Sequence, residues 1–292
     1  MIKQTLKPYY HFLKRAYKEN KYRQYLRGKL EQRKVILVHQ MGKVASTSLV
    51  NSLEKLDSDM AICHTHYVKK ESLDDFIQKY KAKKLPLDNY LIESQEISQF
   101  LDRTSQDYPW KIITIVREPI ARNMSMFFEN LDKGKQTNLY MPDFVEKYQS
   151  GVLEVDNLIN NFLSQYPHEI PLNWLDKEIK DVFGVDVYSF DFSHDKGYQI
   201  IEFKNVEILI LRLESLQNCL QDAFSEFLGI DNFRLSNKNQ AKQKTYFEVY
   251  SDFLNSIVLP QSYIDKMYSS KYMKHFYSQN EIDKFREKWS KH

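Results

Sequence analysis

Short apolar runs rich in β-branched residues alternate along the chain with longer amphipathic stretches. The apolar runs have the length of strands, and the amphipathic stretches have the spacing of helices. The predicted strands are residues 34–39, 60–63, 89–92, 110–116, 198–203 and 206–211. The predicted helices are residues 45–56, 71–84, 120–131, most of 141–183, a stretch ending near Gly229, and the chain beyond the polar segment that begins at Ser236. This alternation predicts an α/β fold, a doubly wound, mainly parallel sheet flanked by helices in a single domain.

The first strand leads into a turn and a helix that together have the geometry of an anion site. Residues 34–39 are followed by the sequence QMGKV and then by a helical segment that begins with three hydroxyl residues. A strand, a tight turn and a helix direct free backbone N–H groups and the helix dipole at an anion, and Lys43 adds a positive charge. An ordinary capped helix is the alternative interpretation, but it leaves the hydroxyl triplet unexplained. The candidate phosphate-binding residues are Gly42, Lys43, Val44, Ala45, Ser46, Thr47 and Ser48.

This loop does not fit a nucleotide triphosphatase. That motif needs a glycine five residues before Gly42, where the chain has Leu37, and a Ser or Thr directly after the lysine, where it has Val44. The remaining pattern, K-x-x-S-T-S from Lys43 onward, resembles the 5′-phosphosulfate loop of sulfotransferases that use 3′-phosphoadenosine-5′-phosphosulfate (PAPS). It is especially similar to the loop of heparan sulfate 2-O-sulfotransferases. The resemblance implies that PAPS is bound here without a metal, with Lys43 stabilising the leaving group.

A second motif follows the strand at residues 110–116. The sequence VREPIARNMS has Arg117 at the end of the strand, Pro119 at the first position of a helix and Ser125 two turns along it. A helix that begins at Pro119 turns back over the strand end, so Arg117 and Ser125 could meet at one ligand. The sequence resembles the 3′-phosphate motif of the same sulfotransferases, with Glu118 in place of the usual Asp. The resemblance implies that Arg117 and Ser125 bind the 3′-phosphate of PAPS.

The resemblance extends over about residues 33–292 and implies a P-loop-like sulfotransferase domain at 34–292. Residues 173–188 and 270–289 look like bacterial proteins described as capsular polysaccharide sulfotransferases. The Arg-Lys-Gly clamp that cytosolic sulfotransferases use for the 3′-phosphate is missing near the C-terminus. The lysines that could replace it are Lys238, Lys242 and Lys244.

The resemblance also indicates a general base. In the 2-O-sulfotransferases a His-x-His element between the two phosphate motifs carries the base, and this chain has His64 and His66 there. We favour His66, with His64 as its helper or alternative, and expect an ordinary imidazole pKa of around 6–7. Two structural histidines are the simpler alternative, and Glu93 and Glu96 are the next candidates for the base.

Zinc is a weaker interpretation of the same element. Cys63, His64 and His66 are all possible ligands, but a Cys directly followed by a His gives poor tetrahedral geometry, and no second pair of ligands appears. No metal is therefore expected. With only one other cysteine, Cys219, the chain cannot form a disulfide framework, and a reducing cytoplasmic compartment is expected.

The net charge of +3 is unevenly distributed. Residues 1–34 carry eleven Lys or Arg and two Glu, a charge of +9 that leaves −6 for the rest of the chain. Aromatic residues interleave with the basic ones in the segment 1–33, which is expected to be helical. Such a helix could lie on the anionic inner face of a membrane, or it could pack its aromatic stripe on the domain. Nucleic acid is not an expected partner, because the basic residues stop where the phosphate motifs begin.

The segment 1–33 lacks the apolar core of a signal peptide, and no run of eighteen apolar residues occurs, so a membrane-spanning helix is not expected. The predicted function is the transfer of a sulfuryl group from PAPS to a hydroxyl of a carbohydrate acceptor of the capsular or exopolysaccharide type. A P-loop small-molecule kinase or NTPase is one alternative. A non-catalytic, membrane-associated polysaccharide assembly factor is the other.

Overall fold

A five-stranded sheet with the order β2-β1-β3-β5-β4 forms the centre of the computed structural model. The structure describes residues 2–32, 34–56, 59–105, 107–235 and 245–290. Four neighbouring strands are parallel, and β4 runs antiparallel to β5 at one edge. The strands are β1 (Lys34–His39), β2 (Met60–Thr65), β3 (Trp110–Val116), β4 (Tyr198–Phe203) and β5 (Val206–Arg212). The predicted mainly parallel sheet flanked by helices is therefore confirmed.

The parallel strands are apolar along nearly their whole length because helices cover both faces of the sheet. Residues 35–39 of β1 and 112–116 of β3 are all buried. β4 and β5 are joined by the two residues Lys204 and Asn205, a connection short enough to make this pair antiparallel.

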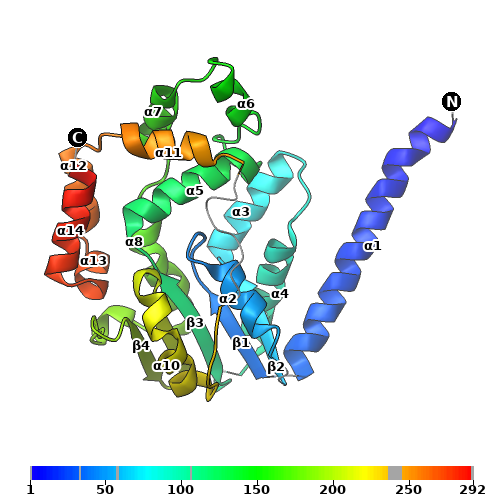
Figure 1. The fold of residues 1–292 in the computed structure, drawn as a ribbon. Coiled ribbons are helices and arrows are strands. Elements are labelled where there is room, and N and C mark those ends of the chain that lie inside the picture. The colour runs from blue at the N-terminus through cyan, green and yellow to red at the C-terminus, as the bar shows by residue number, and fades with distance from the viewer. Residues whose placement is uncertain (1, 33, 57–58, 106, 236–244, 291–292) are drawn as a thin grey trace.

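Helices flank the sheet, and α5 and α11 lie beyond the carboxyl ends of the strands (Figure 1). The helices are α1 (Ile2–Gln32), α2 (Ser46–Leu53), α3 (Lys70–Ala82), α4 (Asn89–Arg103), α5 (Pro119–Lys133), α6 (Phe144–Gln149), α7 (Val155–Gln165), α8 (Ile170–Leu175), α9 (Asp181–Phe183), α10 (Leu216–Leu228), α11 (Phe247–Ser256), α12 (Gln261–Tyr268), α13 (Lys271–Phe276) and α14 (Gln279–Ser290). A π-helical turn, η1 (Asp176–Lys180), and two 3₁₀ turns, η2 (Val187–Ser189) and η3 (Leu213–Ser215), complete the elements.

The strand predicted at residues 89–92 is wrong, because this segment is the first turn of α4. Leu91 and Ile92 are buried together with Ile97 and Phe100 further along the same helix. An apolar run of four residues has the same appearance in a buried strand and in the first turn of a buried helix, so periodicity alone could not separate them.

The helix α1 projects from the domain as a separate rod (Figure 1). Its C-terminal part is anchored by Leu26 and Leu30, which are buried, and by ion pairs from Arg23 and Arg27 to Glu96 of α4 at 2.9 and 2.7 Å. Tyr17 and Tyr25 are 69% and 61% exposed, so these two aromatic side chains of α1 do not pack on the domain. No helix in the described part of the chain has the length and apolar character needed to cross a bilayer.

Candidate active site

The two candidate phosphate motifs lie at the carboxyl ends of the adjacent strands β1 and β3. β1 pairs with β2 on one side and with β3 on the other, so the chain leaves β1 at the point where the strand order reverses. Ligands of open α/β sheets bind in the crevice outside such a point. The sheet therefore brings together segments 40–48 and 117–125, which are about seventy residues apart in sequence.

The loop after β1 has an unusual backbone. Lys43 and Ala45 both have positive φ angles, 71° and 66°, although neither is glycine. Each such residue costs on the order of 1–3 kcal/mol and persists only where the surroundings require it. Ala45 is also why α2 begins at Ser46, one residue later than predicted. Gly42 lies so close to α5 that a Cβ there would displace the end of the Met126 side chain.

A cavity of about 540 Å³ is lined by nine of the eleven predicted site residues. These are Gly42, Lys43, Ala45, Ser46, Thr47, Ser48, His66, Arg117 and Ser125. The other two are not among its lining residues. Val44 is fully buried, so only its backbone could take part in binding. His64 packs against His66, with 4.7 Å between the ring centroids.

Lys43 is held by an acidic residue that the sequence analysis missed. Its Nζ lies 3.1 Å from Glu129 Oε2, while Lys133 Nζ lies 3.2 Å from Glu129 Oε1, and both partners come from α5. Tyr246 also donates to Glu129 at 3.4 Å. Glu129 follows Ser125 by four residues, one helical turn along α5. This spacing places the two side chains on the same face of the helix, so Glu129 could have been predicted to lie near the site. An anion bound at the loop would compete with Glu129 for the ammonium group of Lys43.

Arg117 joins the two motifs directly. Its Nη1 donates to the backbone carbonyl of Lys43 at 2.9 Å. Arg117 also lines a neighbouring cavity of about 310 Å³ whose walls include the aromatic side chains Tyr250 and Trp289. Because Tyr250 lines both cavities as well, the candidate site continues past Arg117 toward an aromatic wall.

A second arginine, Arg122, supports the loop from beneath and was not assigned from the sequence. It is 1% exposed, and its Nε donates to the carbonyl of Gly42 at 3.3 Å. Its Nη1 donates to Tyr166 at 2.8 Å and to Asn123 Oδ1 at 3.1 Å. These partners fix the guanidinium under the loop, where its positive charge favours a bound anion.

His66 is arranged to accept a proton. Its Nδ1 lies 2.7 Å from the carbonyl oxygen of Gln40, and because a carbonyl can only accept, Nδ1 carries the hydrogen and Nε2 keeps its lone pair. Burial lowers the pKa of His66 to about 4, so the ring is neutral at neutral pH. The ring is thus an acceptor at the edge of the cavity, with a lower pKa than the ordinary imidazole value expected from the sequence.

His64 stands in a different position. Its ring centroid is 4.7 Å from that of His66, which agrees with the predicted common side, but His64 is not among the residues that line the cavity. Burial lowers the pKa of His64 to about 3, and its Nε2 is buried without a hydrogen-bond partner in the described structure. These features suit a ring that packs against His66 rather than one that contacts a substrate.

The carboxylates considered as alternative bases do not reach the cavity. Glu93 accepts a hydrogen bond from the backbone N–H of His64 at 3.0 Å, and Glu96 is held by Arg23 and Arg27. Both belong to α4 and not to a strand end. The lysines proposed for the missing clamp, Lys238, Lys242 and Lys244, lie outside the described residues.

The C-terminal helices hold the second motif in place. The backbone N–H of Arg117 donates to the Tyr272 hydroxyl at 3.0 Å, and that hydroxyl donates back to the Arg117 carbonyl at 2.9 Å. Glu118 accepts from the N–H groups of Ile120 and Ala121 at 2.7 and 2.8 Å, so it caps α5 in place of the usual Asp. Burial raises the pKa of this carboxyl.

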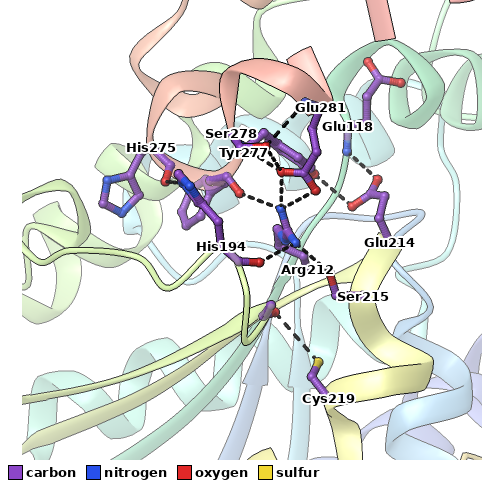
Figure 2. A network of polar contacts seen from close by, with 12 residues as sticks. Glu118, His194, Arg212, Glu214, Ser215, Cys219, His275, Tyr277, Ser278 and Glu281 are labelled. Carbon is purple, nitrogen blue, oxygen red and sulfur yellow. Dashed lines mark hydrogen bonds and ion pairs between the residues drawn. The ribbon is translucent and has the colours of Figure 1, made fainter. Parts of the chain in front are cut away.

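The end of β5 anchors the same region (Figure 2). Glu214 accepts from the Glu118 N–H at 2.9 Å and from the Tyr277 hydroxyl at 2.9 Å. Arg212 donates to both carboxylate oxygens of Glu281 at 2.8 and 2.9 Å and to Ser215 Oγ at 2.8 Å. The loop after β3 is therefore fixed by residues more than ninety positions later in the chain.

Residues 152–278 match the model of the NKWYS family, described as "Putative capsular polysaccharide synthesis protein". No curated protein and no solved structure matches the chain. The matched segment begins after both phosphate motifs and ends within the C-terminal helices that support Arg117. The matched segment contains none of the predicted site residues, but it does contain Leu213, Tyr246, Phe247 and Tyr250, which line the same cavity.

Proposed function

We propose that the chain transfers a sulfuryl group from PAPS to a hydroxyl group of a carbohydrate acceptor of the capsular or exopolysaccharide type. The observation that supports this most is the meeting of the loop at Lys43, the pair Arg117 and Ser125, and His66 around one cavity. The family similarity of residues 152–278 supports a polysaccharide acceptor. We also infer a P-loop-like fold, since the loop follows β1 next to β3.

The donor would bind across the two motifs. The loop amides, the hydroxyls of the triplet and Lys43 suit the 5′-phosphosulfate, and Arg117 with Ser125 suits the 3′-phosphate. In the transfer, the bond from sulfur to the bridging phosphate oxygen breaks while a bond from sulfur to the acceptor oxygen forms. Lys43 would leave its ion pair with Glu129 and bind the donor instead. There it would stabilise the negative charge on the leaving oxygen.

The proton of the acceptor hydroxyl would pass to His66 Nε2. His66 Nδ1 stays bonded to Gln40, which fixes the tautomer and the ring orientation. A ring with a pKa of about 4 is a weak base toward a free alcohol. It is suited to a transition state in which the hydroxyl has already become acidic through bonding to sulfur.

Nucleotide binding separates this function from its alternatives. Calorimetry with 3′-phosphoadenosine-5′-phosphate (PAP) should show binding that needs no magnesium, whereas a kinase or NTPase should prefer ATP with magnesium. Labelled PAPS and a panel of bacterial polysaccharides should then show transfer of the label. Absence of PAP binding would support the assembly factor, and magnesium-dependent ATP turnover would support the kinase.

We propose further that α1 contacts an anionic membrane surface. The exposed rings of Tyr17 and Tyr25 and the exposed basic side chains of Lys14, Lys18 and Lys21 support this partner. The protein should sediment with phosphatidylserine vesicles and not with phosphatidylcholine vesicles. The double variant Tyr17→Ala/Tyr25→Ala should weaken this association, and equal binding to both vesicle types would contradict it.

A further inference from the structure

A third cavity, larger than either of the two described above, lies between α3 and the segment 167–178. Its volume is about 810 Å³, and it has no role in the function proposed above. Phe76 and Ser72 of α3 line one side, and Asn173 and Trp174 of α8 line the other. The wall formed by residues 167–178 lies entirely within the segment that matches the capsular polysaccharide synthesis family model. We call this cavity the α3–α8 cleft.

The α3–α8 cleft and the candidate active site share one segment of chain. The side chain of His66 lines the active-site cavity, and the next residue, Tyr67, lines the cleft. Trp174 Nε1 donates to the carbonyl oxygen of His66 at 2.9 Å. Glu178 accepts from the N–H groups of Val68 and Lys69 at 2.8 and 3.0 Å. The wall of the cleft is therefore hydrogen-bonded to the backbone of the candidate base.

The side chains that line the cleft suit a sugar ring. The rings of Tyr67 and Phe76 are stacked at 4.6 Å between centroids with an angle of 29°, and both are half-buried. The two rings cover each other on one face, and Lys79 Nζ lies 5.5 Å from the Phe76 centroid, so the partly exposed remainder of the pair is what the C–H groups of a pyranose would contact. The exposed amide of Asn173 and the hydroxyl of Ser72 can hydrogen-bond to its hydroxyl groups.

The charges in the cleft balance. Four lysines and four carboxylates line it, so its formal charge is zero. Lys69 lies 2.6 Å from Asp181, Lys79 lies 2.6 Å from Asp75, and Lys266 pairs with Glu169. A cleft without net charge exerts little long-range attraction on a polyanion. It therefore favours an uncharged chain rich in hydroxyl groups over a polymer of uronic acids.

We propose that the α3–α8 cleft binds the acceptor as a neutral glycan chain and presents one of its hydroxyls toward His66. The identity of this ligand as the acceptor rests on the proposed function, whereas glycan binding by the cleft does not. The cleft would hold sugar units next to the reacting one, and the shared segment 66–69 would set their distance from the base.

The test uses the full chain and an array of immobilised bacterial glycan fragments, some neutral and some containing uronic acids. The wild type should bind at least one neutral fragment. Phe76→Leu keeps an apolar side chain but removes the aromatic face, and Asn173→Ala removes the amide. Each should weaken glycan binding about tenfold, the usual effect of losing one such contact. Asn160→Ala, an exposed amide on α7 outside these cavities, should leave binding unchanged.

PAP binding, measured by calorimetry on the same preparations, keeps the two proposals separate. Glycan binding that is absent, restricted to uronic-acid fragments, or equal in the wild type and both cleft variants would overturn the cleft assignment, even with normal PAP binding. Glycan binding that follows the expected pattern without any PAP binding would retain the cleft as a glycan site and overturn the sulfotransferase function.

Discussion

The two candidate phosphate motifs are supported by different parts of the chain. The loop at residues 40–48 has left-handed conformations at Lys43 and Ala45, and the nearby second motif and α5 hold it, since Arg117 and Arg122 donate to the carbonyls of Lys43 and Gly42. The loop at residues 117–118 obtains its position from distant residues, since Tyr272 binds both backbone groups of Arg117 and Glu214 binds the N–H of Glu118. A ligand contact made by the first loop should therefore respond to local substitutions, and one made by the second should also respond to changes in the C-terminal helices.

The largest effect on turnover should come from His66, whose ring contacts the carbonyl oxygen of Gln40 in the first loop. His66→Ala should reduce turnover by roughly 10²–10⁴, the usual contribution of acid–base catalysis, while PAP binding stays normal. Turnover assays and calorimetry on one preparation measure both quantities. His64→Ala is the matched control, and it should cost much less because His64 does not line the cavity. Equal losses in both variants would indicate a structural role for the pair.

The pH dependence of turnover follows from the pKa of His66. Because burial lowers this pKa to about 4, the ring is neutral and competent above that pH and becomes protonated below it. The rate should therefore fall as the pH drops through about 4, with this acid limb absent from the residual activity of His66→Ala. An acid limb at an ordinary imidazole pKa of about 6–7 would show that the ring is more hydrated than its contacts indicate.

Within the first loop, Lys43→Ala should reduce turnover by about a hundredfold, equivalent to about 3 kcal/mol of transition-state stabilisation, with a smaller loss of donor binding. The reason is that charge on the leaving oxygen develops only during transfer. Steady-state kinetics with PAPS, together with PAP calorimetry, separate the two effects. Equal losses in donor binding and turnover would show that Lys43 only anchors the donor.

In the second motif, Arg117→Ala should weaken PAP binding by about ten- to a hundredfold, the value of a hydrogen bond to a charged group. Affinity for adenosine 5′-phosphosulfate, which lacks the 3′-phosphate, should change little. A double-mutant cycle with Ser125→Ala should show coupling, because both residues would bind one phosphate. An equal loss of affinity for both nucleotides would contradict the assignment of Arg117 to the 3′-phosphate.

The distant support of the second motif can be tested alone. Tyr272→Phe removes the hydroxyl that bonds both backbone groups of Arg117, so the protein should lose about 1–3 kcal/mol of unfolding free energy. Affinity for PAP should fall more than affinity for adenosine 5′-phosphosulfate. Denaturant unfolding and calorimetry measure the two effects. Normal stability would mean that the Arg117 loop holds its shape without the C-terminal helices.

The smallest effect should come from relieving the strain of the first loop. Ala45→Gly should stabilise the protein by up to about 1 kcal/mol, because glycine adopts a positive φ without the clash of a Cβ atom, although its greater freedom in the unfolded chain opposes part of the gain. Denaturant unfolding measures this change. A loss of stability greater than 1 kcal/mol would show that the Ala45 side chain, and not only its backbone, supports the loop.

Local sequence was sufficient for most of the fold and for the first loop. Residues 34–39, 110–116 and 206–211 form strands where their apolar runs predicted them, because a strand buried on both faces must be apolar throughout. The residues of the first loop are contiguous, so their pattern was visible before the structure. The segment 89–92 was misassigned because four apolar residues fit either element, and only the packing of α4 decides between them.

Tertiary structure alone decided which side chains meet at the site. The pairing of Lys43 with Glu129, the place of Arg122 beneath Gly42 and the support of Arg117 by Tyr272 join residues 80 to 155 positions apart. The low pKa of His66 likewise depends on burial by surrounding elements. The sequence by itself predicted the five strands of the sheet, the candidate anion-binding loop and the candidate base, because each depends on residues that are neighbours in the chain. The partners of the site side chains, the burial of His66 and the α3–α8 cleft all depend on how the sheet and helices pack. A short stretch of sequence does not contain this information.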